Sequence, residues 1–184
     1  MNERIVELDG GWLQVKVPLP YSLKWVNAYL LPEGDSGWTV IDPGLRLEET
    51  EAFWEEVMRS RNLAWGDIAR IVVTHHPPDH YGMAGWFQER AGAPVWMSPV
   101  AHSNAIRLWG DGATFSEQLT AAFLRHGLAG ELEDAMRAHL TGFRAKVSPH
   151  PSEVRLLSPG ETFSMGGVEW DVHGGEGHAP GHLL

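Results

Sequence analysis

The sequence predicts a mixed α/β (α+β) fold in which a histidine-rich loop follows a buried strand. Three features of the 184-residue chain lead to this prediction. Strand-length segments near the N-terminus are rich in alternating apolar residues, and residues 68–74 form a short, nearly continuous apolar run that leads into the histidines. Helical spacing then dominates residues 99–147. We therefore expect strands first, a βαβ unit next, and a helical segment after it.

The N-terminal segments predict an antiparallel meander followed by a helix. Strands are expected at 12–17, 26–31 and 38–41, with turn-forming residues between the last two. Residues 47–63 have apolar side chains at helical spacing, with acidic residues early and arginines late, as the helix dipole favours.

The βαβ unit places the histidines at the end of a buried strand. The run at 68–74 has the composition of a strand covered on both faces, residues 80–90 read as a helix, and 93–98 as the next strand. Sites in open α/β sheets commonly lie at such strand ends.

The remainder of the chain is expected to belong to the same domain. Residues 1–184 are predicted to form a single domain, incomplete at its C-terminus, with residues 99–147 as a helical insertion within it. Helices are expected at 105–109, 117–126 and 130–144. Short strands follow at 155–157, 162–164 and 168–172, separated by glycine- and proline-containing turns.

Composition and charge restrict the partners and the metal ligands. Acidic residues number 24 against 14 basic ones, so the net charge of -10 disfavours nucleic acid and anionic membrane surfaces as partners. The chain has no cysteine, which leaves histidine and carboxylate side chains as the metal ligands. No segment approaches the ~20 apolar residues of a membrane span, and the N-terminal residues lack a signal-peptide pattern, so a cytoplasmic location is expected.

The loop after residue 74 combines donors that suit a divalent metal ion. His75, Asp79 and His80 lie within one short loop, and nitrogen and oxygen ligands of this kind favour zinc and similar ions. A structural interpretation is equally open on this pattern alone: His75 and His76 as surface loop residues and Asp79 as the N-cap of the next helix.

A second histidine cluster lies about a hundred residues later. His178 sits in a glycine- and proline-rich loop after a predicted strand and is expected to face the first loop. His182 is interpreted as a supporting or ordinary loop residue rather than a ligand. His102, His126, His139 and His150 are expected to be solvated, and Trp54, Trp86, Trp96 and Trp170 to belong to the core.

Three motifs together resemble the metallo-β-lactamase superfamily, in particular its glyoxalase II-like branch, over essentially the whole chain. They lie at residues 40–44 (Val-Ile-Asp-Pro-Gly), 74–82 (Thr-His-His-Pro-Pro-Asp-His-Tyr-Gly) and 177–182 (Gly-His-Ala-Pro-Gly-His). The resemblance implies an αββα sandwich, of which this chain matches the N-terminal half with a helical insertion. It also implies two metal ions per intact site, usually zinc with iron or manganese as alternatives, and a metal-activated water that attacks an ester, thioester, lactone or amide.

The resemblance also assigns roles to particular residues. His75, Asp79, His80 and His178 correspond to metal ligands, and Asp79 is the catalytic residue that would orient or deprotonate the water. Asp42 corresponds to a residue that supports the site. The family's second histidine falls on Pro77, whose side chain has no donor atom, so weak binding at the first metal position is expected. His76 is one residue out of register and is not expected to replace it.

The resemblance stops at Leu184, where the family continues with further ligands and strands. A second copy or a complementing chain is therefore expected as a partner at an uncovered sheet edge near residues 183–184. The resemblance also implies a small-molecule acyl substrate at the site. The alternative function is a catalytically inactive truncated remnant, or a non-enzymatic interaction module with impaired metal binding and few or no metal ions.

Overall fold

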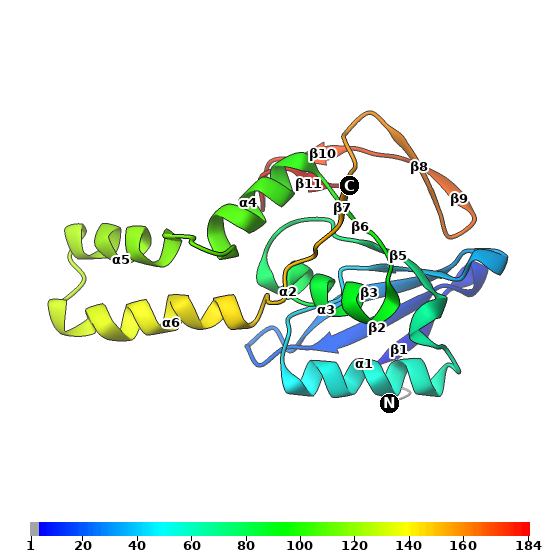
Figure 1. Ribbon diagram of the computed structural model, residues 1–184, viewed down its shortest axis with the longest axis horizontal. Coiled ribbons are helices and arrows are strands. Elements are labelled where there is room, and N and C mark those ends of the chain that lie inside the picture. Colours follow the sequence, from blue (N-terminus) through cyan, green and yellow to red (C-terminus); the bar gives the residue numbers. More distant parts are fainter. Residues whose placement is uncertain (1–3) are drawn as a thin grey trace.

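The structure, a computed structural model, describes residues 4–184. Its main feature is a seven-stranded mixed sheet with strand order β1 to β7 (Figure 1). The strands are β1 (Ile5–Glu7), β2 (Leu13–Pro18), β3 (Trp25–Pro32), β4 (Trp38–Ile41), β5 (Ile68–Val72), β6 (Val95–Met97) and β7 (Val154–Leu156). Strands β1 to β4 are antiparallel, and β4 to β7 are parallel. The predicted meander and βαβ unit are confirmed, and β1 is an additional edge strand.

Helices α1 (Glu48–Ser60) and α3 (Ala84–Ala91) contribute the largest side chains of the main core. Trp54 of α1 and Trp86 and Phe87 of α3 are almost fully buried. The ring of Trp54 meets that of Phe87 edge to face, with centroids 4.9 Å apart, a geometry favoured by the aromatic quadrupoles. Trp54 and Trp86 are thus core residues as predicted, whereas Trp96 and Trp170 are only partly buried.

The single helix predicted at 80–90 is wrong in one respect, because the chain forms two helices there. Helix α2 (Pro78–Tyr81) ends at Gly82, and α3 begins at Ala84. The backbone N–H of Met83 donates to the carbonyl of Gly44 at 2.8 Å instead of continuing the helical ladder. A tertiary hydrogen bond therefore sets the break.

Residues between β6 and β7 form three helices, α4 (Pro99–Trp109), α5 (Phe115–Arg125) and α6 (Glu133–Ala145). Figure 1 shows α5 and α6 side by side, extending away from the sheet. Helix α4 begins earlier than predicted because Ser98 caps it: its Oγ accepts a hydrogen bond from the Ala101 N–H at 3.0 Å, and Pro99 suits the first helical position.

Four short strands form two small ladders on the side of the large sheet opposite helices α1 and α3. Strands β8 (Thr162–Met165) and β9 (Val168–Asp171) form a hairpin, and β10 (Gly174–Gly175) pairs with β11 (His182–Leu183). A small apolar cluster joins them to the sheet through Val72, Phe163 and Leu183. Short 3-10 turns occur at η1 (Asp9–Gly11), η2 (Gly34–Ser36), η3 (Trp65–Asp67) and η4 (Gly130–Leu132).

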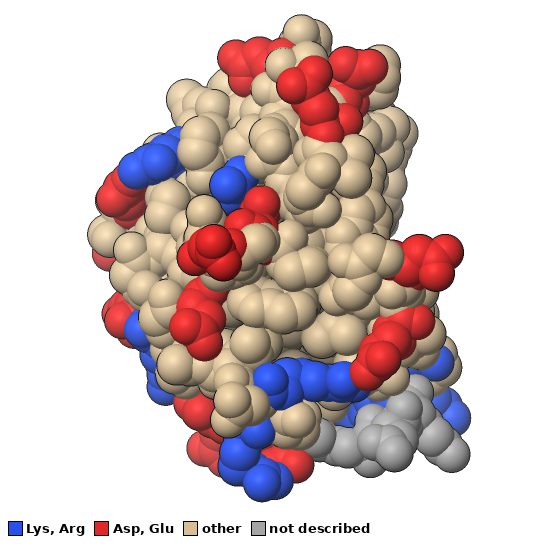
Figure 2. All heavy atoms as spheres, turned by 90° about the vertical axis from the view of Figure 1, so that its right-hand side faces the viewer, with Lys and Arg blue, Asp and Glu red and all other residues tan. Residues whose placement is uncertain are grey.

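On the face drawn in Figure 2, acidic and basic groups are scattered around a broad uncharged area. Across residues 4–184, none of the helices is both long enough and apolar enough to cross a lipid bilayer.

Candidate metal centre

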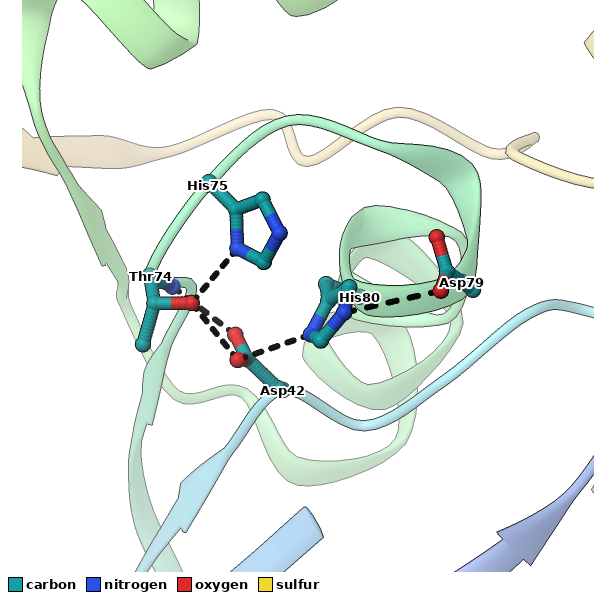
Figure 3. A network of polar contacts seen from close by, with 5 residues as sticks. All are labelled: Asp42, Thr74, His75, Asp79 and His80. Atoms are coloured by element: carbon teal, nitrogen blue, oxygen red, sulfur yellow. Dashed lines mark hydrogen bonds and ion pairs between the residues drawn. The ribbon is translucent and has the colours of Figure 1, made fainter. Parts of the chain in front are cut away.

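The site is built where the parallel strands β4 and β5 end side by side. Asp42 follows β4 directly, and Thr74, His75 and the rest of the loop follow β5. The backbone N–H of Asp42 donates to the carbonyl of Val72 at 2.9 Å, which fixes the two strand ends relative to each other. Helix α2 then supplies Asp79 and His80. Residues distant in the chain are thereby gathered at one edge of the sheet (Figure 3).

The carboxylate of Asp42 organises this corner. Its Oδ1 accepts the backbone N–H of Thr74 at 2.8 Å, and its Oδ2 accepts the Thr74 hydroxyl at 2.6 Å and the Nδ1–H of His80 at 2.9 Å. Asp42 is buried and has a positive φ of 51°, a conformation in which Asp is tolerated better than most residues.

These hydrogen bonds determine which ring nitrogen of His75 is free. The single hydroxyl proton of Thr74 is donated to Asp42, so its oxygen accepts from Nδ1 of His75, 2.7 Å away. The proton of the neutral ring is therefore on Nδ1, and Nε2 keeps its lone pair. Within residues 4–184, this buried Nε2 has no hydrogen-bond partner.

His80 is oriented in the same way. Its Nδ1 donates to Asp42, and its Nε2 lies 3.5 Å from Oδ2 of Asp79. The rings of His75 and His80 are 4.0 Å apart between centroids. Donor atoms of Asp42, His75 and His80 lie within 4.8 Å of one another and could hold a metal ion. Because both oxygens of Asp42 already accept hydrogen bonds, we assign Asp42 to orienting the histidines rather than to ligation.

The pKa values of the two rings move in opposite directions. Burial, with help from the nearby His80, lowers the pKa of His75 to about 3. Burial also opposes the charged form of His80, but the hydrogen bond and charge of Asp42 and the charge of Asp79 together raise its pKa above the ordinary value. His75 is thus neutral at pH 7, the form in which imidazole binds a metal ion.

The structure brings the second histidine cluster to this corner. The ring of His178, on the exposed loop between β10 and β11, lies 5.1 Å from that of His75. His182 of β11 stacks on His75 with centroids 4.3 Å apart and an interplanar angle of 25°. The backbone N–H of Leu183 donates to the carbonyl of Thr74 at 2.9 Å, which attaches β11 to the loop. His182 therefore packs directly against the ring of His75, whereas the sequence predicted only a supporting or an ordinary loop residue.

Several sequence-based expectations need correction. The interpretation of His75 and His76 as surface residues is wrong, because their exposed fractions are 3% and 8%. Asp79 is not a helix N-cap, since α2 begins at Pro78 with Pro77 in that position. The carbonyl of Pro77 accepts the N–H groups of His80 and Tyr81, both at 3.0 Å, so Pro77 starts the helix without offering a side-chain ligand.

Two participants were missed from the sequence. Thr74 was regarded only as the end of a strand, although its hydroxyl links Asp42 to His75. His150 was expected to be solvated, but it is partly buried and bonds to Tyr81. No local pattern marks either role, because each depends on a partner brought close by the fold.

Most of the sequence matches a known protein family. Residues 26–184 match the family model described as the metallo-beta-lactamase superfamily. The chain belongs to this superfamily. The match covers both histidine clusters and both strand ends that carry them.

Solved structures of superfamily proteins show the same fold. A metallo-beta-lactamase family protein from Thermus thermophilus superposes with a TM-score of 0.77 at 30% identity, over 97% of this chain and 56% of its own. A beta-lactamase domain protein from Burkholderia ambifaria gives a TM-score of 0.76 at 28% identity, over 97% of this chain and 50% of its own. The chain thus spans about half the length of these relatives.

A curated bacterial protein is also similar. The "Probable metallo-hydrolase YqjP" of Bacillus subtilis (strain 168) is 32% identical over 77 residues, which are 42% of this chain and 24% of that protein. This similarity accompanies the family match over residues 26–184.

Proposed function

We propose that this chain forms part of a metal-dependent hydrolase in which an activated water attacks an ester, thioester, lactone or amide. The observation that carries the proposal is the buried Nε2 of His75, which has no hydrogen-bond partner among residues 4–184. The hydrogen bonds from His75 to Thr74 and from Thr74 to Asp42 keep the lone pair of this atom free. A buried polar atom without a partner is costly in a folded protein, and a bound cation would satisfy it.

The residues present fit a divalent ion. His75, Asp79, His80 and His178 would hold it, with zinc as the first candidate and iron or manganese as alternatives. Such an ion, when bound, acidifies water and polarises a carbonyl group. Asp79 is the catalytic residue in this proposal: its carboxylate, beside Nε2 of His80, would orient the attacking water and accept its proton. We expect a small acyl substrate.

Pro77 favours a second candidate function. A proline at this position provides no side-chain donor. If the site takes two metal ions, the four ligands named above leave each ion with fewer than the three protein ligands of typical catalytic zinc sites. The chain would then be a catalytically inactive remnant, or an interaction module with impaired metal binding.

Metal content separates the two candidates. The purified protein would be loaded with zinc, dialysed and analysed for bound metal, beside His75→Ala and the control His126→Ala, which removes an exposed histidine at the end of α5. The hydrolase proposal expects bound zinc that His75→Ala abolishes and His126→Ala keeps, and hydrolysis of a simple thioester or lactone. Loss of all metal from the unmodified protein would support the inactive alternative.

A partner chain is part of the proposal. An apolar cavity lined by Leu31, Phe163 and Leu183 lies between the sheet and the small strands, and we propose that a second copy or a complementing chain covers this side of the sheet near β8 to β11. Nucleic acid and membranes are not expected as partners because of the net charge of -10. A cytoplasmic location stays a prediction.

A further inference from the structure

The residue directly after His80 has a buried hydroxyl with a specific partner. Tyr81, the last residue of α2, is 1% exposed. Its hydroxyl lies 2.9 Å from Nδ1 of His150, and Nε2 of His150 lies 3.0 Å from the backbone carbonyl oxygen of Trp109. A carbonyl oxygen only accepts, so Nε2 carries the proton, and in the neutral ring Nδ1 accepts the hydroxyl proton of Tyr81.

The segment that carries His150 lies directly against the end of α2. A Cβ atom on Gly82 would be 2.6 Å from the carbonyl oxygen of Lys146, and one on Gly85 would overlap the carbonyl oxygen of Pro149. The Lys146 carbonyl also accepts the backbone N–H of Arg46 at 3.1 Å. Glycines at 82 and 85 therefore allow backbone-to-backbone contact between residues 146–150 and the α2–α3 junction.

This arrangement connects two parts of the fold that are distant in sequence. Residues 146–150 leave α6, and the carbonyl that His150 binds belongs to the last residue of α4. At the other end, α2 is a four-residue helix that contains both Asp79 and His80. A helix this short has little stability of its own, so its orientation depends on such tertiary contacts.

We propose that Tyr81 and His150 are positioning residues that set the orientation of α2, and hence of Asp79 and His80, toward the metal ion. The proposal rests on the proposed metal site. The hydrogen bonds of His150 to Tyr81 and to the carbonyl of Trp109 then link the helical segment α4–α6 to metal affinity, although none of the side chains of this segment is a predicted ligand. If packing alone were needed at Tyr81, phenylalanine would serve equally well, because the hydroxyl adds only the hydrogen bond.

The test measures zinc affinity by competition with a chromophoric chelator, and thermal unfolding of the metal-free protein. Tyr81→Phe and His150→Leu should each weaken zinc binding about 10-fold or more, as for other supporting partners of metal ligands. The double variant should lose little beyond either single one, because both remove the same interaction. His150→Asn, whose Oδ1 can accept the Tyr81 hydroxyl, should bind more tightly than His150→Leu.

The control is Tyr29→Phe, which removes a partly buried hydroxyl on β3 that accepts from Gln14. It should leave zinc affinity unchanged. A metal-free readout, the imidazole nitrogen shifts of His80 by NMR, should change in Tyr81→Phe and not in Tyr29→Phe.

The outcomes separate this proposal from the function it rests on. If Tyr81→Phe and His150→Leu lower the unfolding temperature but leave zinc affinity within about twofold, the pair is only structural and the inference is overturned, while the metal site stands. If the unmodified protein binds no zinc, both proposals fail together.

Discussion

At the scale of single residues, the hydrogen bonds of Asp42 decide the chemistry of the corner. Asp42 accepts hydrogen bonds from the Thr74 hydroxyl and from Nδ1–H of His80, and the Thr74 oxygen accepts one from Nδ1–H of His75. Each histidine is thus held by Nδ1 and presents Nε2. The direction of these bonds makes Nε2 the atom that each ring can offer to a metal ion when that nitrogen carries no proton.

Asp42→Asn should weaken zinc binding by about 10- to 100-fold, the usual cost of losing a partner of a metal ligand. Asparagine fits the same space and tolerates the positive φ, but its NH2 group donates hydrogen bonds and cannot accept one from His80 or Thr74. Competition titration with a chelator measures the change. Asp171→Asn, at an exposed position of β9, is the matched control and should bind normally; equal affinity of both variants would refute the role of Asp42.

The metal-free protein should lose stability as the pH falls from about 6.5 toward 3. The pKa of His75 is lowered by burial to about 3 in the folded state, whereas the unfolded chain binds this proton near pH 6.5. The unfolded state therefore binds more protons across this window, so acid favours unfolding. Urea titrations at several pH values would show it.

The variant His75→Gln isolates that contribution from other titrating groups. His76 and His182 also have pKa values lowered mainly by burial, so acid destabilisation should shrink in the variant but not vanish. A pH dependence identical to that of the unmodified protein would show that His75 is not held neutral by the fold.

At the scale of secondary-structure elements, close backbone contact fixes the metal-binding helix. Helix α2 is followed by the tight contact of Gly82 and Gly85 with residues 146–150. The amphipathic helices α1 and α3 instead depend on burying aromatic side chains against the sheet. The sequence pattern indicates the aromatic packing of α1 and α3 but not the backbone contact beside α2, because a glycine contact leaves no periodic signal.

Gly85→Ala should destabilise the protein by about 1–3 kcal/mol, since a new methyl group would overlap the backbone of Pro149. Gly142→Ala in α6 is the matched control: a Cβ there meets no atom of the described residues within 4 Å, and alanine should stabilise the helix by about 0.5–1 kcal/mol. Urea unfolding measures both. The expectation is opposite signs, and stabilisation by Gly85→Ala would contradict the close contact.

At the scale of the whole molecule, the side of the large sheet that carries the small strands has an apolar cavity. A cavity of about 380 Å³ lies between the sheet and the small strands, with Leu31, Phe163 and Leu183 in its lining. Leu184 at its edge is 69% exposed. Apolar surface of this kind favours association with another polypeptide.

We expect dimers or larger assemblies at micromolar concentration, measured by light scattering. Leu184→Glu should shift the protein toward the monomer, because it places a charge at the edge of the apolar cavity. Leu132→Glu, which alters a similarly exposed leucine on η4 at the far end of the helical segment, should not. A monodisperse monomer of the unmodified protein would contradict the expected association.

The sequence by itself determined most of the architecture and the position of the site. Apolar periodicity predicted the meander, the βαβ unit and the helical stretch, because burial of an apolar face is a local, repeating property. The sequence motifs also predicted His75, Asp79, His80 and His178 as metal ligands. The structure places all of these residues at one corner of the sheet, while their role as ligands stays a prediction.

Only the tertiary structure decided how the site is organised. The bonds of Asp42 to His80 and of Tyr81 to His150 join residues 38 and 69 positions apart, and the break between α2 and α3 depends on the carbonyl of Gly44. A hydrogen bond has a direction and a partner, and both are specified by where the packed core places distant strand ends. Local sequence carries no record of that placement, so the donor nitrogens, the role of Thr74 and the burial of His150 became visible only in the folded chain.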